Sequence, residues 1–138
     1  MLYDLGSGAG FPGLVIAILR PDLDVHLIES DQRKCSFLRA VSRETGASVS
    51  VHNARIEETS LPAPDVVTAR ALAPLGTLLG FCEQWMNPDL YALFLKGETY
   101  DEEIAEALEK YDVEASVIPI AIAQNSALVK VNWKLSIL

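Results

Sequence analysis

The sequence of 138 residues lacks several features that mark particular classes of protein. Its two cysteines, Cys35 and Cys82, lie far apart in helix-like stretches, so neither a disulfide framework nor a metal-ligand pair is predicted. No apolar run approaches the roughly 20 residues that cross a bilayer, and no signal-peptide pattern follows Met1. We therefore expect free buried thiols, no metal and no membrane association, in a cytoplasmic protein.

Positive charge is also scarce, because 11 Lys and Arg residues stand against 19 Asp and Glu residues and give a formal net charge of -8. Such a balance argues at first against a nucleic-acid partner, which requires Lys and Arg on one face. The acidity is local, however, since eight acidic residues but one lysine lie within residues 98–114. Arg33, Lys34, Arg39 and Arg43 fall in one stretch, which forms either a modest basic patch or an ordinary solvated helix face.

The apolar content, 50%, is enough for one continuous core, so we expect a single domain over residues 1–138. Hydrophobic alternation predicts strands at residues 1–5, 24–29, 48–52, 66–69, 91–96, 113–121 and 128–135. Helical spacing and end signals predict helices at residues 12–19, 31–45, 75–85 and 100–110. The pattern predicts an α/β fold with a mostly parallel sheet, helices on both faces and an antiparallel hairpin at the C-terminal end.

A glycine-rich loop joins the first predicted strand to the first predicted helix. Gly6, Gly8 and Gly10 lack a Cβ atom, so the backbone can adopt positive φ angles and approach a ligand closely. The pattern differs from the dinucleotide fingerprint because Phe11 occupies the position of its third glycine. A methyl donor such as S-adenosylmethionine therefore fits better than a pyrophosphate, although a nicotinamide cofactor and a tight turn without a ligand remain alternatives.

Polar residues follow three other strands at the same edge of the predicted sheet. Glu29 ends the second strand, about twenty residues beyond the loop, where a carboxylate can accept hydrogen bonds from ribose hydroxyls. Ile56 and Glu57 follow the third strand and are candidates to contact the face and the polar edge of adenine. Arg70, after the fourth strand, would face a cofactor carboxylate or a substrate phosphate, or would form an ordinary surface ion pair.

These residues resemble a known family, the bacterial 16S ribosomal RNA guanine-N7 methyltransferases, also called the glucose-inhibited division protein B family. The loop has that family's Asp-x-Gly-x-Gly-x-Gly-Phe-Pro-Gly form, ending at Gly13. Further matches run in order through most of the chain: Glu29-Ser30-Asp31-Gln32-Arg33-Lys34, Phe37-Leu38, Arg55-Ile56-Glu57-Glu58, Ala69-Arg70-Ala71-Leu72-Ala73-Pro74-Leu75 and Leu95-Lys96-Gly97.

The resemblance implies a Rossmann-like class I methyltransferase fold with a seven-stranded sheet, which binds S-adenosylmethionine and acts on 16S ribosomal RNA or the small ribosomal subunit. Gly6 and Phe11 would contact the donor, Ile56 and Glu57 would hold its adenosine part, and Arg70 would lie beside the reaction site. It also implies that a helical segment precedes the first strand in the family, so that this chain corresponds to an N-terminally truncated member.

We assign no catalytic base. Guanine N7 already carries a lone pair, and the two histidines, His26 and His52, lie within predicted strands, where a structural role is favoured. The sites expected to bind the cofactor are Gly6, Gly8, Gly10, Phe11, Gly13, Glu29, Ile56, Glu57 and Arg70. Two other functions stay open, namely methylation of a small molecule by the same fold and donor binding without activity.

Overall fold

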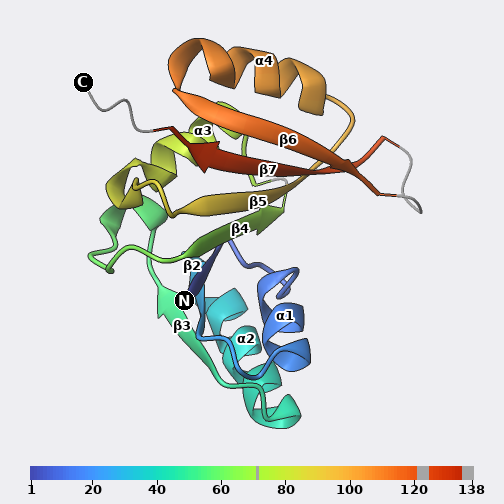
Figure 1. Ribbon diagram of the computed structural model, residues 1–138. Helices are drawn as coiled ribbons and strands as arrows, with labels where there is room; N and C mark the ends of the chain where they lie inside the picture. Colours follow the sequence, from blue (N-terminus) through green and yellow to red (C-terminus); the bar gives the residue numbers. More distant parts are fainter. Residues whose placement is uncertain (71, 121–124, 135–138) are drawn as a thin grey trace.

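The structure is a computed structural model that describes residues 1–70, 72–120 and 125–134 (Figure 1). Its strands are β1 (Leu2–Leu5), β2 (Val25–Glu29), β3 (Val49–Asn53), β4 (Val66–Arg70), β5 (Tyr91–Lys96), β6 (Val113–Pro119) and β7 (Ala127–Trp133). Its helices are α1 (Gly13–Leu19), α2 (Gln32–Thr45), α3 (Leu75–Cys82) and α4 (Tyr100–Lys110), with 3-10 turns η1 (Ile56–Glu58) and η2 (Glu83–Trp85).

All seven strands form one sheet in the order β3-β2-β1-β4-β5-β7-β6. The pairs from β3 to β5 are parallel, whereas β7 pairs antiparallel with both β5 and β6. This topology confirms the predicted sheet and its C-terminal hairpin. The strand order reverses between β1 and β4, so the carboxyl ends of these strands form the switch point at which ligands bind in open α/β sheets.

Helices cover both faces of the sheet, as predicted (Figure 1). On one face, Leu14 and Ala17 of α1 and Leu38 of α2 pack with Leu2 and Leu27. On the other face, α3 and α4 pack over the larger apolar cluster, whose central members include Tyr3, Ile28, Val67, Leu78 and Phe94. The two helix layers hold the strand ends in a fixed relation to one another, which positions the loops that follow them.

Local signals account for the ends of α2. The Asp31 side chain accepts hydrogen bonds from the backbone N–H groups of Arg33 and Lys34, at 2.8 and 3.3 Å, and so caps the first turn. Gly46 ends the helix with a φ angle of 71°, the left-handed conformation that glycine adopts at little cost. The helix therefore begins and ends within one residue of the predicted bounds.

Three element ends differ from the prediction or cannot be compared with it. The helix expected at residues 75–85 ends as α3 at Cys82 and continues as the 3-10 turn η2. The turn η1 was not predicted. The final strands end earlier than predicted, at Pro119 and Trp133, and their expected last residues, Ala121 and Leu135, lie outside the described residues.

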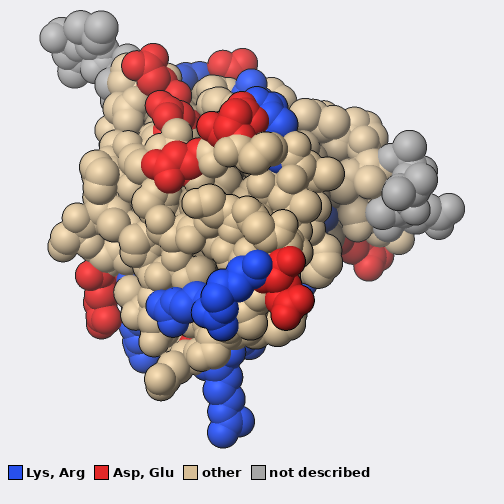
Figure 2. Space-filling view, turned by 90° about the horizontal axis from the view of Figure 1, so that it is seen from below, with Lys and Arg blue, Asp and Glu red and all other residues tan. Residues whose placement is uncertain are grey.

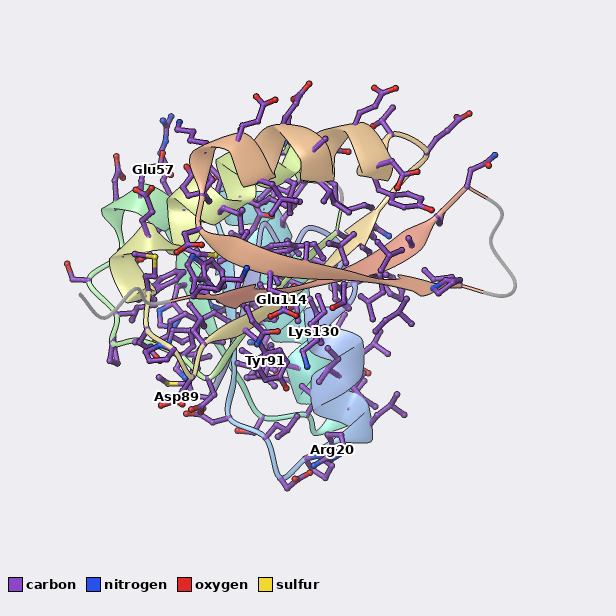
Figure 3. The ribbon with its side chains drawn as sticks, turned by 45° about the horizontal axis from the view of Figure 1, so that its top comes forward. Arg20, Glu57, Asp89, Tyr91, Glu114 and Lys130 are labelled. Carbon is purple, nitrogen blue, oxygen red and sulfur yellow. The ribbon has the colours of Figure 1, made fainter. Side chains whose placement is uncertain are left out.

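The face of the sheet formed by β5, β7 and β6 carries partly exposed side chains (Figure 3). Asn132 of β7 pairs with Tyr91 on the neighbouring strand β5 and with Glu114 on the neighbouring strand β6. The ammonium group of Lys130 lies 5.0 Å from the centroid of the Tyr91 ring. A cation held over a ring in this way adds to the cross-strand contacts of the hairpin.

Candidate cofactor site

The glycine-rich loop lies between the end of β1 and the start of α1, at the switch point of the sheet. Gly6, Gly8 and Gly10 have φ angles of 61°, 54° and 97°, which other residues rarely adopt. A Cβ atom built on Gly8 would find only the carbonyl oxygen of Gly6 within 4 Å, at 3.8 Å. The backbone at Gly8 is therefore open to an approaching ligand.

Glu29 is buried beneath this loop and is held by two backbone groups. Its Oε1 atom accepts a hydrogen bond from the N–H of Gly8 at 2.9 Å, and its Oε2 atom accepts one from the N–H of Asp31 at 2.8 Å. The two bonds fix the carboxylate at the end of β2 and tie it to the glycine loop. Each carboxylate oxygen keeps a further acceptor site, so Glu29 can still accept the hydroxyl groups of a ribose.

A cavity of about 460 Å³ opens beside Glu29 and the loop. Five residues of the predicted site line it: Gly6, Gly8, Glu29, Ile56 and Glu57. Figure 3 shows Glu57 projecting outward from the η1 segment. The wall also contains residues that sequence reasoning did not select: Ile28, Ser30, Lys34, Ala54, Arg55, Leu72, Ala73 and Phe81. Apolar walls with a few fixed polar groups suit a nucleoside, whose base is apolar on its faces and whose sugar is polar.

Four other predicted residues do not line this cavity. Gly10 and Gly13 instead allow close packing. A Cβ atom on Gly10 would lie 2.9 Å from the Cβ of Leu14, and a Cβ atom on Gly13 would lie 2.6 Å from the Cβ of Asp4. Phe11 and Arg70 lie next to each other, with the guanidinium carbon 5.9 Å from the ring centroid. Whether these four residues contact a cofactor stays a prediction, as does cofactor contact by the five that line the cavity.

Asp4 is a member of the loop motif that was not selected as a site residue. It is fully buried, and its Oδ1 atom accepts a hydrogen bond from the Thr68 hydroxyl at 2.6 Å. Its Oδ2 atom has no hydrogen-bond partner within the described part of the chain. Burial raises the pKa of Asp4 to about 6, although the hydrogen bond from Thr68 and the charge of Arg70 act in the opposite direction. Its position at the end of an apolar strand, directly before the glycines, was the available sequence signal.

A buried ion pair supports the cavity wall from behind. The ammonium group of Lys96 lies 2.9 Å from Oε1 of Glu103 and donates to the carbonyl of Ala73 at 2.7 Å. The same Glu103 oxygen accepts the N–H of Leu75 at 2.9 Å. Leu72, in the segment held by these bonds, packs against Gly6, where an added Cβ atom would lie 2.7 Å from its Cδ1 atom. The segment after β4 is thus fixed both to β5 and to the glycine loop.

The remaining candidates for chemistry are accounted for by packing. Cys35 and Cys82 are free and buried, as predicted. His26 and His52 lie in β2 and β3, and the Nδ1 atom of His26 lies 2.8 Å from the Nε2 atom of His52. No group of three or more potential metal ligands occurs among the described residues. Within the same part of the chain, no helix has the length and hydropathy needed to cross a membrane.

Comparison with known sequences identifies relatives over most of the chain. A family model described as rRNA small subunit methyltransferase G matches residues 1–129. The ribosomal RNA small subunit methyltransferase G of Parvibaculum lavamentivorans is 48% identical over 134 residues, which cover 94% of this chain and 59% of that protein. Its counterpart from Paramagnetospirillum magneticum is 50% identical over 118 residues, which cover 86% of this chain and 57% of that protein. This chain therefore spans about three fifths of the length of these relatives.

Comparison with solved structures confirms the fold class. A ribosomal protein L11 methylase from Lactobacillus delbrueckii subsp. bulgaricus has a TM-score of 0.78 at 16% identity, with 97% of this chain and 69% of that chain covered. An rRNA methylase from Streptococcus thermophilus has a TM-score of 0.70 at 12% identity, with 96% of this chain and 85% of that chain covered. The fold is thus the Rossmann-like fold of methyltransferases.

Proposed function

Since this chain belongs to the family of rRNA small subunit methyltransferase G, we propose that it binds S-adenosylmethionine and transfers the methyl group to N7 of a guanine in 16S ribosomal RNA. The observation that carries the proposal is the cavity at the switch point, where Glu29 is fixed by the N–H of Gly8 beside an apolar wall. The description of the family supports small-subunit ribosomal RNA as the substrate, and guanine N7 is the position that the resemblance of the sequence motifs implies.

The residues of the cavity fit the adenosine part of this donor. Glu29 would accept the ribose hydroxyl groups, because its carboxylate is already oriented by two backbone N–H groups. Adenine would lie against Ile56 and Leu72, which line the cavity from opposite segments of the chain. Glu57 would be available to the polar edge of the base. Arg70 would face the donor carboxylate or a phosphate of the substrate.

When bound, the donor supplies a methyl group on a sulfonium sulfur. The lone pair of guanine N7 would form the new N–C bond as the S–C bond breaks, and the bonding electrons would return to sulfur and leave a neutral thioether. No proton has to leave N7 before this step, so the chain needs no general base. Its residues would contribute by holding the methyl carbon in line with N7 and by excluding other geometries.

The test combines donor binding with methyl transfer. Calorimetry should detect S-adenosylmethionine binding to the chain, and labelled donor should modify guanine N7 of small ribosomal subunits that lack the methyl group. Glu29→Gln should weaken donor binding about tenfold or more, because the amide cannot accept at both positions. Glu44→Gln, on the exposed side of α2, is the matched control and should bind normally.

The outcomes separate the alternatives. Donor binding without transfer to ribosomal substrates would favour a binding module that lacks activity. Transfer to small molecules only would overturn the RNA proposal while keeping the donor site. An absence of donor binding would overturn the proposal entirely.

A further inference from the structure

The charges of the molecule are separated between its two ends. Helix α4 carries five acidic residues and one lysine, whereas α2 carries four basic residues and one glutamate. The two helices lie at opposite ends of the molecule (Figure 1) and on opposite faces of the sheet. A protein with this arrangement can present a basic surface to a polyanion and keep its acidic helix at a distance.

The basic side chains of α2 are exposed and available. Arg33, Lys34, Arg39 and Arg43 are all exposed to solvent. None of them forms an ion pair with a carboxylate of the described residues. By contrast, Arg20, labelled in Figure 3, is paired with Asp22 at 2.7 Å. Figure 2 shows Lys and Arg side chains in the middle and at the lower edge of the face that is seen from below, with some Asp and Glu side chains beside them.

The helix also exposes an aromatic ring among these charges. Phe37 is 50% exposed, although apolar residues on the buried side of α2, such as Leu38, are fully covered. It lies four residues after Arg33 and three after Lys34, so the three side chains are neighbours on the helix surface. Exposed aromatic side chains beside cations are the surfaces on which unpaired RNA bases stack.

The basic surface is continuous with the proposed cofactor site. Lys34, in the first turn of α2, lines the cavity together with Arg55, which follows β3. RNA lying along α2 would therefore run toward the mouth of the cavity. Lys34 and Arg55 would attract its phosphate groups there, while Glu29 and Glu57, which line the same cavity, stay available to the donor.

We infer that the outer face of α2, formed by Arg33, Lys34, Phe37, Arg39 and Arg43, is a docking surface for the RNA substrate. The cations contact successive phosphates, and Phe37 stacks on an unpaired base. This inference rests on the proposed function, because it assigns a surface to the RNA that the enzyme methylates. It also explains how a chain with a net charge of -8 can bind a polyanion.

The test compares two double variants with the same net charge. Arg39→Gln with Arg43→Gln removes two cations from α2, while Lys110→Gln with Lys134→Gln removes two exposed cations from other parts of the molecule. Binding of unmethylated 16S ribosomal RNA is measured over a range of salt concentrations, and donor binding is measured by calorimetry. Arg39 and Arg43 do not line the cavity, so the α2 variant should bind the donor normally.

The α2 variant should lower the slope of log affinity against log salt by about 2 and weaken RNA binding about 10-fold to 100-fold near 0.1 M salt. The control variant should keep the slope of the original protein. Phe37→Leu should weaken binding about tenfold, and Phe37→Trp should restore it. Equal slopes for the two double variants, or normal binding by Phe37→Leu, would overturn the inference.

Failure of the proposed function gives a different result. If the unaltered chain binds the donor but no RNA at any salt concentration, both the proposed substrate and the docking surface are wrong. If it binds and methylates RNA, and the α2 variants do so equally well, only the docking surface is wrong.

Discussion

The ion pair between Lys96 and Glu103 gives the most direct test of how the cavity wall is held. The side chains are 4% and 16% exposed, and their charged atoms lie 2.9 Å apart. Lys96→Met removes the cation and leaves the Glu103 carboxylate in a largely buried place with its bonds to Leu75 and Thr99. A buried charge without its partner is costly, so the free energy of unfolding should fall by about 3 kcal/mol.

A double-mutant cycle separates the ion pair from the rest of the environment. Glu103→Gln keeps an acceptor for the N–H of Leu75 but removes the negative charge, so it should reduce the free energy of unfolding by about 2 kcal/mol. The double variant should lose about 3 kcal/mol, which corresponds to a coupling of about 2 kcal/mol between the two side chains. Lys110→Met, at the exposed end of α4, is the matched control and should change the value by less than about 0.5 kcal/mol.

Urea unfolding followed by circular dichroism measures these values, and calorimetry with S-adenosylmethionine provides a second readout. Donor affinity should fall in Lys96→Met, because the Ala73 carbonyl that Lys96 holds belongs to the cavity wall. A loss below about 1 kcal/mol in Lys96→Met, or a double variant equal to the sum of the single variants, would refute the reasoning.

Three further predictions follow from individual side chains. The pKa of Asp4 is raised to about 6 in the folded protein, whereas the same carboxyl group in the unfolded chain loses its proton near pH 4. The free energy of unfolding should therefore fall as the pH rises from about 4 to about 6. Measured against Asp4→Asn, the unaltered protein should lose about 2 kcal/mol of unfolding free energy between pH 4 and pH 7, and a constant difference would contradict this. Gly13→Ala should lower the free energy of unfolding by about 1 to 3 kcal/mol in thermal unfolding, because the added methyl group would overlap Asp4. Gly76→Ala, which has open space around it in α3, should instead raise the free energy of unfolding by about 0.5 to 1 kcal/mol. Burial raises the pKa of Cys82 to about 12, so a thiol reagent at pH 8 should modify Cys82 only as fast as the protein unfolds, and rapid labelling of the folded protein would show the thiol to be accessible.

The elements that could be predicted are those whose signals are local. The strand alternation of residues 91–96 and the helical spacing of residues 31–45 each depend on neighbours along the chain, and both elements occur as predicted. The cap at Asp31 and the left-handed Gly46 are single-residue signals of the same kind. The end of α3 at Cys82 was missed because the chain passes directly into the 3-10 turn η2, and no glycine or proline marks the change at Cys82 and Glu83.

Some of the residues that line the cavity could be predicted for the same reason. Glu29 was identified because it lies about twenty residues after the glycine loop, which is the length of one helix and one strand, so that it ends the strand next to the loop. Leu72 and Phe81 could not be identified, because they reach the cavity from segments that only the folded sheet brings to β1 and β2. The role of Gly13 was also hidden, since the side chain that demands its small size, Asp4, lies across the loop.

The sequence by itself determined the order of strands and helices, the conformation of the glycine loop and the family to which the chain belongs. The order of elements and the loop conformation follow from hydrophobic periodicity and backbone preferences, which act over a few residues. The family follows from motifs that occur in the same order along the chain. The tertiary structure alone decided which glycines line the cavity and which lie closely packed against Leu14 and Asp4, which side chains close the far wall of the cavity, and that the acidic and basic helices lie at opposite ends. Those outcomes depend on distances between segments far apart in the chain, and such distances are set when the two layers of helices pack against the sheet.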